Sequence, residues 1–118
     1  MEPQRSSEPV IYGEGECGGR YKGLNFLQAV RKLCNENDII MIVDEVTSGF
    51  RLSLGGWHQS ESINCIPDVA VFGKGLSNGY ALGAVIGKKE VMEAAQGSFI
   101  SSTYFTEDVG FTAALACL

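Results

Sequence analysis

Features that would assign this chain to several common classes of protein are missing from its 118 residues. No apolar run reaches the roughly 18 residues that a membrane-spanning helix needs, and residues 1–9 are too polar for a secretory signal, so we expect neither. Basic residues are few: nine Lys and Arg against fourteen Asp and Glu give a net charge of −5, and no basic run occurs. Nucleic acid and anionic membranes are therefore not expected as partners.

Signals for metal binding and disulfide bonding are equally sparse. His58 is the only histidine, and no cysteine pair has the short spacing of a zinc site. The four cysteines are Cys17, Cys34, Cys65 and Cys117. Because nothing indicates secretion, we expect reduced and mostly buried thiols in a cytoplasmic protein. Two disulfides are the alternative that an even number of cysteines leaves open.

What the chain does have is the composition of one folded domain. Hydrophobic residues make up 45% of it and charged residues 19%, values typical of a globular protein rather than a disordered one. A chain of 118 residues allows one domain with one modest core. Residues 113–118 are all apolar and need a surface to cover them. We therefore expect the chain to be a piece of a larger protein.

The spacing of apolar residues predicts alternating helices and strands. Helices are expected at residues 24–37, 88–95 and 108–118, and strands at residues 39–43, 69–72 and 82–86. The unbroken apolar run of the first strand is typical of a strand buried on both faces in a parallel sheet, and the last helix is apolar enough to be buried. Residues 47–66 show no helical periodicity, so we expect an irregular excursion there. The pattern predicts an α/β fold, part of a mostly parallel sheet flanked by helices.

Two charged residues stand where strands of this sheet are expected to end. Asp44 directly follows the apolar run 39–43, and Lys74 follows Gly73 after the run 69–72. Ligands bind outside the carboxyl ends of parallel strands, and neighbouring strands lie only ~5 Å apart. The two side chains can therefore hold opposite ends of one small ring. An amine that forms a Schiff base with an aldehyde, and a carboxylate that holds a pyridinium N–H, suit a pyridine cofactor.

Ordinary structural explanations remain open for each of these residues. Lys74, flanked by glycines, also fits a surface turn, and Asp44 can simply cap a loop. The hydroxyls of residues 101–103 precede the last expected helix and suit either a phosphate or an ordinary helix cap. A phosphate-binding loop of the G-x-x-x-x-G-K-[ST] type is excluded at Lys74, because Asp68 replaces its first glycine and Gly75 its hydroxyl residue.

A dinucleotide-binding module is the alternative that the first glycines suggest. Gly13–Gly18 matches G-x-G-x-x-G after a short apolar stretch, and a helix and a strand ending in Asp44 are expected to follow. Two acidic residues, Glu14 and Glu16, would however face the pyrophosphate. Asp44 also lies 26 residues after the last glycine of the motif, against about 20 in that class of protein. This is therefore the weaker hypothesis.

Four stretches carry a more specific signal: Glu2–Arg5, Asp44–Arg51, Pro67–Gly75 and Gly79–Ala84. Together, in this order and at this spacing, they resemble the class III (subgroup II) pyridoxal-phosphate aminotransferases, and the glutamate-1-semialdehyde aminomutase branch in particular. The likeness extends over nearly all of the chain. Its specific part is the D-E-V-x-x-G-F-R block followed by the P-D…G-K-G block.

The resemblance implies a fold and roles for single residues. It implies the large cofactor-binding domain of a fold type I pyridoxal-phosphate enzyme, with residues 1–118 its middle-to-late part, and with the N-terminal part and the small C-terminal domain absent. Lys74 corresponds to the lysine that binds the cofactor covalently, Asp44 to the acid paired with the pyridine nitrogen, and Val46 to the apolar residue against the ring. Thr103 corresponds to a threonine that reaches the cofactor phosphate of the neighbouring subunit, which implies a homodimer.

The activity that the resemblance implies is a transfer of an amino group, or its shift within one molecule, with pyridoxal 5′-phosphate as cofactor. Lys74 would form the Schiff base and then move a proton, while Asp44 keeps the pyridinium protonated. Because part of the site is expected to lie outside residues 1–118, the isolated chain is expected to be inactive. A truncated, non-catalytic product is a further alternative.

Overall fold

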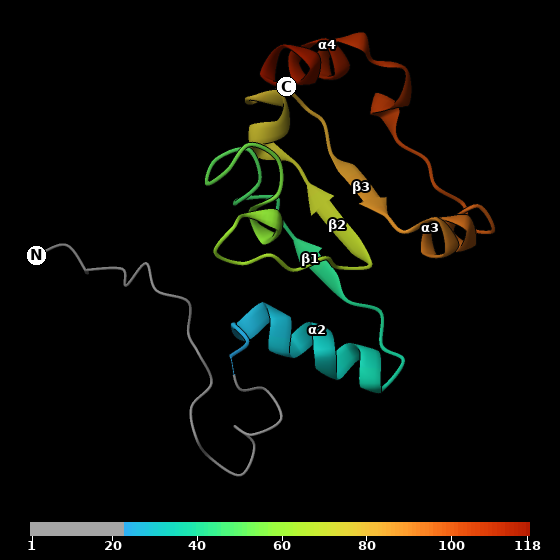
Figure 1. Ribbon diagram of the computed structural model, residues 1–118. Coiled ribbons are helices and arrows are strands. Elements are labelled where there is room, and N and C mark those ends of the chain that lie inside the picture. Colours follow the sequence, from blue (N-terminus) through green and yellow to red (C-terminus); the bar gives the residue numbers. More distant parts are fainter. Residues whose placement is uncertain (1–22) are drawn as a thin grey trace, which may run out of the picture.

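A computed structural model describes residues 23–118, which form a small mixed β-sheet with helices around it (Figure 1). The strands are β1 (Ile42–Asp44), β2 (Val69–Phe72) and β3 (Ala84–Gly87), in the order β1-β2-β3. β1 and β2 run parallel, and β2 and β3 run antiparallel. The expected α/β class and the parallel pairing of the first two strands are thus confirmed.

The helix α2 (Phe26–Glu36) forms where the sequence predicts one. It begins at Asn25, whose side chain accepts the backbone N–H of Gln28 at 2.9 Å, while the Gln28 side chain accepts the backbone N–H of Asn25 at 3.3 Å. This reciprocal capping satisfies two otherwise unpaired donors of the first turn. The helix ends at Asn37, and Asp38 follows with φ 52°, a left-handed conformation that an α-helix does not continue.

The irregular excursion expected between β1 and β2 is also confirmed. Residues 45–68 contain turns and one short 3₁₀ helix, Trp57–Gln59. A connection between parallel strands has to return the chain from the carboxyl end of the first strand to the amino end of the second. This loop therefore supplies side chains at both edges of the sheet, Thr47 at one and Asp68 at the other.

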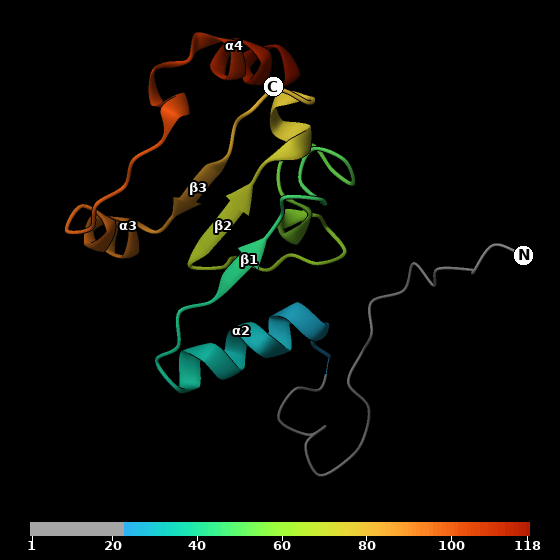
Figure 2. The same ribbon diagram turned by 180° about the vertical axis from the view of Figure 1, so that it is seen from behind.

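The last two helices, α3 (Lys89–Ala95) and α4 (Asp108–Cys117), follow β3. α4 lies beside the 3₁₀ helix Lys74–Ser77 that follows β2, as the views from both sides show (Figures 1 and 2). One core cluster joins β2, this 3₁₀ helix and α4, and consists of Ala70, Phe72, Leu76 and Ala114. A second core cluster joins α2 to the start of β1 and consists of Cys34, Met41 and Cys65.

Two expectations about burial are wrong. β1 is not buried on both faces, because Ile42 is 63% exposed and Ile39 and Ile40 are more than half exposed. The physical reason is that, within residues 23–118, helices do not cover both faces of this edge strand. α4 is not buried either: it packs through Ala114 but leaves Leu115 75% exposed. An apolar sequence thus predicts a need for cover, which this part of the chain only partly provides.

Some expectations concern residues outside the described range, namely Glu2–Arg5, Gly13–Gly18 and Cys17. Among the described residues, the three cysteines Cys34, Cys65 and Cys117 are free thiols. No helix of residues 23–118 is long and apolar enough to cross a membrane. In the same range no three His, Cys, Asp or Glu side chains gather as they would around a metal ion.

Candidate functional site

Lys74 lies at the abrupt exit of β2. Gly73 is fully extended (φ −173°), and Lys74 then takes a left-handed conformation (φ 40°) as the 3₁₀ helix Lys74–Ser77 begins. For a residue with a Cβ this conformation costs roughly 1–2 kcal/mol, so it persists only where the surrounding structure holds it. Strained residues of this kind gather at functional sites. Four other described residues, Asp38, Phe50, Asn64 and Asn78, also have positive φ, so the strain supports Lys74 as a candidate only together with its amine.

The amine of Lys74 meets the segment that leaves β1. Its Nζ donates a hydrogen bond to Oγ1 of Thr47 at 2.8 Å, and both side chains are exposed. Val46 lies on the same side, because a Cβ added to Gly73 would be 3.5 Å from Cγ1 of Val46. The structure therefore places Val46 beside Gly73, the residue before Lys74, and adds Thr47 as the direct partner of the amine.

Asp44 lies at the same edge of the sheet. It is the last residue of β1, is paired in register with Val71 of β2, and is exposed. Because the two strands are parallel neighbours, Asp44 and Lys74 both leave the sheet at its carboxyl edge. Oδ1 of Asp44 accepts the backbone N–H of Val46 at 2.9 Å. This bond fixes the start of the turn that presents Thr47 to Lys74.

A surface hollow of about 510 Å³ lies beside Lys74. Phe50, Arg51, Tyr80 and Leu82 contribute to its lining together with Lys74, whereas Asp44 is not among the lining residues. Its volume falls within the range of about 300–1,000 Å³ that is typical of small-molecule sites. The hollow therefore offers space next to the lysine, on a side that the acid does not line.

Thr103 is placed differently from the other predicted residues. It is exposed and begins the 3₁₀ helix Thr103–Thr106, where Ser102 Oγ accepts the backbone N–H of Tyr104 at 3.1 Å. The N-cap of α4 is instead Glu107. Ser102 thus caps the short 3₁₀ helix rather than α4. Within residues 23–118, no hydrogen bond joins the Thr103 side chain to Lys74, Asp44 or Val46.

Glu45, which directly follows Asp44, is buried beneath this edge at 1% exposure. Its Oε1 accepts the backbone N–H of His58 at 2.8 Å and contacts Nδ1 of the His58 ring at 2.7 Å, and its Oε2 accepts the hydroxyl of Ser48. Burial raises the pKa of the Glu45 carboxyl, but the hydrogen bonds from Ser48 and His58 outweigh it and hold the pKa below its usual 4.5. The Glu45 side chain is therefore held as a buried carboxylate.

Residues 7–118 match the sequence model of one protein family, aminotransferase class-III. The chain belongs to the class-III aminotransferases. It is 44% identical over 91 residues to the 3-aminobutyryl-CoA aminotransferase of Cloacimonas acidaminovorans (strain Evry). This match covers 76% of this chain and 22% of that protein. It is 36% identical over 114 residues to the glutamate-1-semialdehyde 2,1-aminomutase of Methanocaldococcus jannaschii. That match covers 94% of this chain and 26% of that protein. The family expected from the sequence is confirmed.

The fold of this class-III aminotransferase chain also matches a solved structure. The PLP internal aldimine form of the FumI protein from Sphingopyxis sp. MTA144 superposes with a TM-score of 0.70 at 28% identity, over 82% of this chain and 23% of that one. The expected fold class is thereby confirmed. The chain spans about a quarter of the length of its curated relatives, 22% and 26% in the two cases above.

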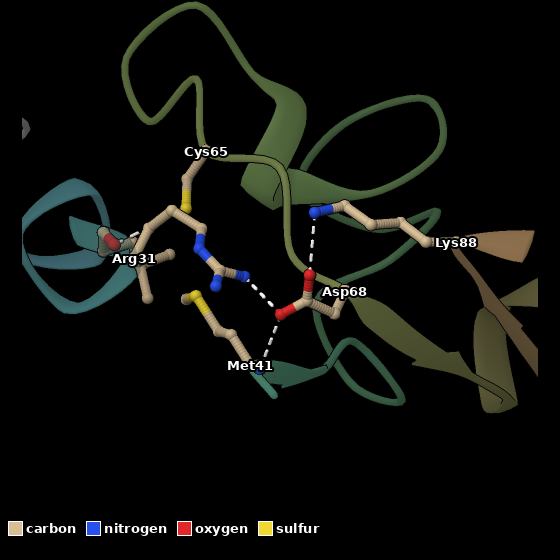
Figure 3. Close-up of polar contacts among 6 residues, drawn as sticks. Arg31, Met41, Cys65, Asp68 and Lys88 are labelled. Atoms are coloured by element: carbon tan, nitrogen blue, oxygen red, sulfur yellow. Dashed lines mark hydrogen bonds and ion pairs between the residues drawn. The ribbon is translucent and has the colours of Figure 1, made fainter. Parts of the chain in front are cut away.

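At the opposite, amino edge of the sheet, the buried side chain of Asp68 joins three elements (Figure 3). Nζ of Lys88, just after β3, donates to its Oδ1 at 2.7 Å. Arg31 of α2 and the backbone N–H of Met41 donate to its Oδ2 at 2.5 and 2.8 Å. These donors, Lys88 first, hold the pKa of Asp68 far below its usual 3.8. Asp68 is therefore a structural anchor remote from Lys74.

No role for Thr47, Glu45 or His58 is predicted from the sequence. Thr47 and Glu45 lie inside the D-E-V-x-x-G-F-R block, and His58 is considered only as a metal ligand. One signal does point to Glu45. Successive side chains of a strand face opposite ways, so if Asp44 faces a ligand, the next residue faces the interior. A charged residue there requires a buried partner, which the histidine provides.

Proposed function

We propose that Lys74 and Asp44 are the cofactor-binding amine and acid of an enzyme that uses pyridoxal 5′-phosphate to transfer an amino group from an amino donor to a carbonyl acceptor, or to shift it within one molecule. The observation that carries this proposal is that both residues leave neighbouring parallel strands at one edge of the sheet. The likeness to an aminotransferase and an aminomutase supports the class of reaction.

The side chains at this edge fit the chemistry of the cofactor. Among residues 23–118 the Lys74 amine is bonded to a hydroxyl and to no carboxylate, so no ion pair has to break before the amine reacts. Asp44 is exposed and uses Oδ1 for one backbone N–H, which leaves its second oxygen for a pyridinium N–H. Val46, half-buried beside Gly73, offers an apolar surface next to Lys74.

Each residue then has a distinct task. When bound, pyridoxal phosphate supplies an electron sink for charge that develops on the substrate α-carbon. Asp44 favours the protonated form of the ring nitrogen, because an adjacent negative charge stabilises a cation where water is scarce. Lys74 holds the cofactor through its amine and, once displaced by substrate, can take up and return a proton at Nζ. Val46 limits the position of the ring.

The remaining expectations are part of the same proposal. Thr103, exposed at the start of its 3₁₀ helix, is proposed to contact the cofactor phosphate held by a second copy of the chain in a homodimer. Residues 1–118 are proposed to be part of a large cofactor-binding domain, in accordance with the quarter of its relatives that the chain covers. The free thiols of the described cysteines support the prediction of a cytoplasmic protein.

Reductive trapping tests the proposal directly. The 118-residue chain is incubated with pyridoxal phosphate, reduced with borohydride, digested, and the modified lysine is identified by mass spectrometry. We expect the label on Lys74, its loss in Lys74→Ala, and its retention in Lys89→Ala, because Lys89 is an exposed lysine of α3. A label of equal yield on Lys89 or other surface lysines would contradict the proposal. Micromolar binding of NAD without a Lys74 label would favour the dinucleotide alternative.

A further inference from the structure

The buried Glu45 carboxylate has no place in the tasks assigned above, although it is the direct neighbour of Asp44. It is 1% exposed, and its carboxylate oxygens are bonded to the loop that follows β1, among others to the Ser48 hydroxyl, the His58 backbone N–H and the His58 ring. A buried carboxylate that accepts several charge-assisted bonds fixes its neighbours strongly, because these bonds are short and directional.

The backbone of Glu45 is fixed as firmly as its side chain. Its N–H donates to the carbonyl oxygen of Val71 in β2 at 2.8 Å, and its carbonyl oxygen accepts the N–H of Gly49 at 2.8 Å. Residues 45–49 therefore form a turn that is closed at both ends. Thr47, whose hydroxyl accepts the hydrogen bond from Lys74, lies in the middle of this turn.

His58 connects this turn to the exit of β2. The ring is 2% exposed and packs against the ring of Phe72, with the two centroids 6.4 Å apart and the planes inclined by 45°. Phe72 is followed at once by Gly73 and Lys74. One imidazole thus contacts the end of β1 through Glu45 and the end of β2 through Phe72.

We propose that Glu45 and His58 form a positioning pair, which sets the place of the 45–49 turn and so holds the Thr47 hydroxyl against the Lys74 amine. The inference rests on the proposed function for the identity of the ligand that this edge binds. Neither residue contacts the Lys74 amine, so both are positioning residues and not catalytic ones. Loss of either partner leaves the other polar group buried without its bond, and the turn moves to relieve it.

The reactivity of Lys74 without cofactor measures this positioning. The chain is treated with formaldehyde and cyanoborohydride, and the rate of methylation at Lys74 is followed by mass spectrometry relative to that at Lys89. The amine has to leave the Thr47 hydroxyl to react, so Thr47→Val should raise the rate about fivefold, the equivalent of one hydrogen bond of about 1 kcal/mol. His58→Leu is expected to raise it to a similar extent. His58→Asn should restore the original rate, because its amide nitrogen can take the place of Nδ1.

A double variant and a matched control separate positioning from general destabilisation. If His58 acts through Thr47, His58→Leu in the Thr47→Val background adds no further increase. Asp68→Asn removes a buried acid at the other edge of the sheet, and is expected to lower stability without changing the Lys74 rate. Should His58→Leu fail to fold by circular dichroism, Gly56→Ala replaces it, since its Cβ would lie 2.4 Å from the imidazole Cε1 and displace the ring.

Two results would overturn the positioning pair. One is a Lys74 rate in His58→Leu, or in Gly56→Ala, that rises no more than in Asp68→Asn. The other is a methylation rate at Lys74 in the double variant that equals the product of the separate increases from His58→Leu and Thr47→Val. Failure of the proposed function looks different: wild-type Lys74 would then take no pyridoxal label in the trapping experiment, while its methylation rate would still respond to Thr47 and His58.

Discussion

The Nζ atom of Lys74 lies 2.8 Å from Oγ1 of Thr47, so that the residues following two parallel strands are joined by their side chains. The contact crosses from the exit of β1 to the exit of β2, where a class-III aminotransferase is proposed to bind its cofactor. It holds the reactive amine at a defined place before any ligand arrives. The bond has to open before the amine can react, so it also limits how readily Lys74 is modified.

The left-handed backbone of Lys74 predicts an unusual order of stability. We expect Lys74→Gly to be as stable as Lys74→Ala or up to about 1 kcal/mol more stable, because glycine relieves the strain at φ 40°. At Glu93, inside α3, the order should be reversed, with alanine favoured by about 1 kcal/mol. Urea denaturation of the four variants measures both differences. The same preference for alanine at both positions would show that Lys74 is not strained.

The close approach of Gly49 to β2 predicts a steric cost. A Cβ at this position would lie 2.6 Å from Cδ1 of Phe72 and 2.9 Å from the Glu45 carbonyl oxygen. Gly49→Ala should therefore lower the free energy of unfolding by about 2 kcal/mol. Gly97→Ala is the control, because its Cβ would meet only the Ala94 carbonyl oxygen at an ordinary 3.6 Å. Equal melting temperatures for the two variants would be inconsistent with this packing.

Asp68 predicts acid sensitivity with a definite sign. Its pKa in the folded chain lies far below the usual 3.8, held there by Lys88, the Met41 N–H and Arg31. The unfolded chain therefore binds a proton first as the pH falls, so the stabilisation is complete above about pH 4 and is lost below it. Asp68→Asn should lower the free energy of unfolding by about 2 kcal/mol at pH 7. The difference in this free energy between the variant and the wild type should become smaller towards pH 2. A difference that stays constant from pH 7 to pH 2 would contradict this assignment.

Asp44 predicts a separation of binding from reaction. Asp44→Ala should still take a borohydride-reducible pyridoxal label at Lys74, because the amine is intact. In the whole protein of which residues 1–118 are proposed to be a part, the rate of exchange of the substrate α-proton in deuterated water is measured by NMR with cofactor present. This rate should fall by about 100-fold or more, since the ring nitrogen loses its counter-charge. Exchange at the wild-type rate would remove Asp44 from its proposed role.

Elements with strong local signals could be predicted from the sequence. The four apolar residues of β2 are preceded by Pro67 and Asp68 and followed by Gly73, and the strand forms at the expected positions 69–72. The strand expected at residues 82–86 was predicted without a direction. Residues 73–83 are too few for the long crossover that a further parallel strand requires, so the antiparallel direction of β3 could have been predicted. Asp44 and Lys74 could be placed at one edge because parallel strands align their carboxyl ends.

Other features depend on the path of the chain in space. His58 meets Glu45 only because the irregular loop folds back beneath β1, and a loop without periodicity carries no signal of where it returns. The exposure of Ile42 could not be predicted either, because an apolar run indicates a preference for burial and not which neighbour supplies it.

Asp68 is held by α2 and by the residues just before β1 and just after β3, and this has a consequence for how the sequence can change in evolution. The hydrogen bonds and ion pairs of Asp68 stabilise the amino edge of the sheet, far from Lys74 and Asp44 at the carboxyl edge. Substitutions around Lys74 can then alter reactivity or substrate preference without weakening the interactions of Asp68. One fold can in this way give rise to enzymes with diverse substrates.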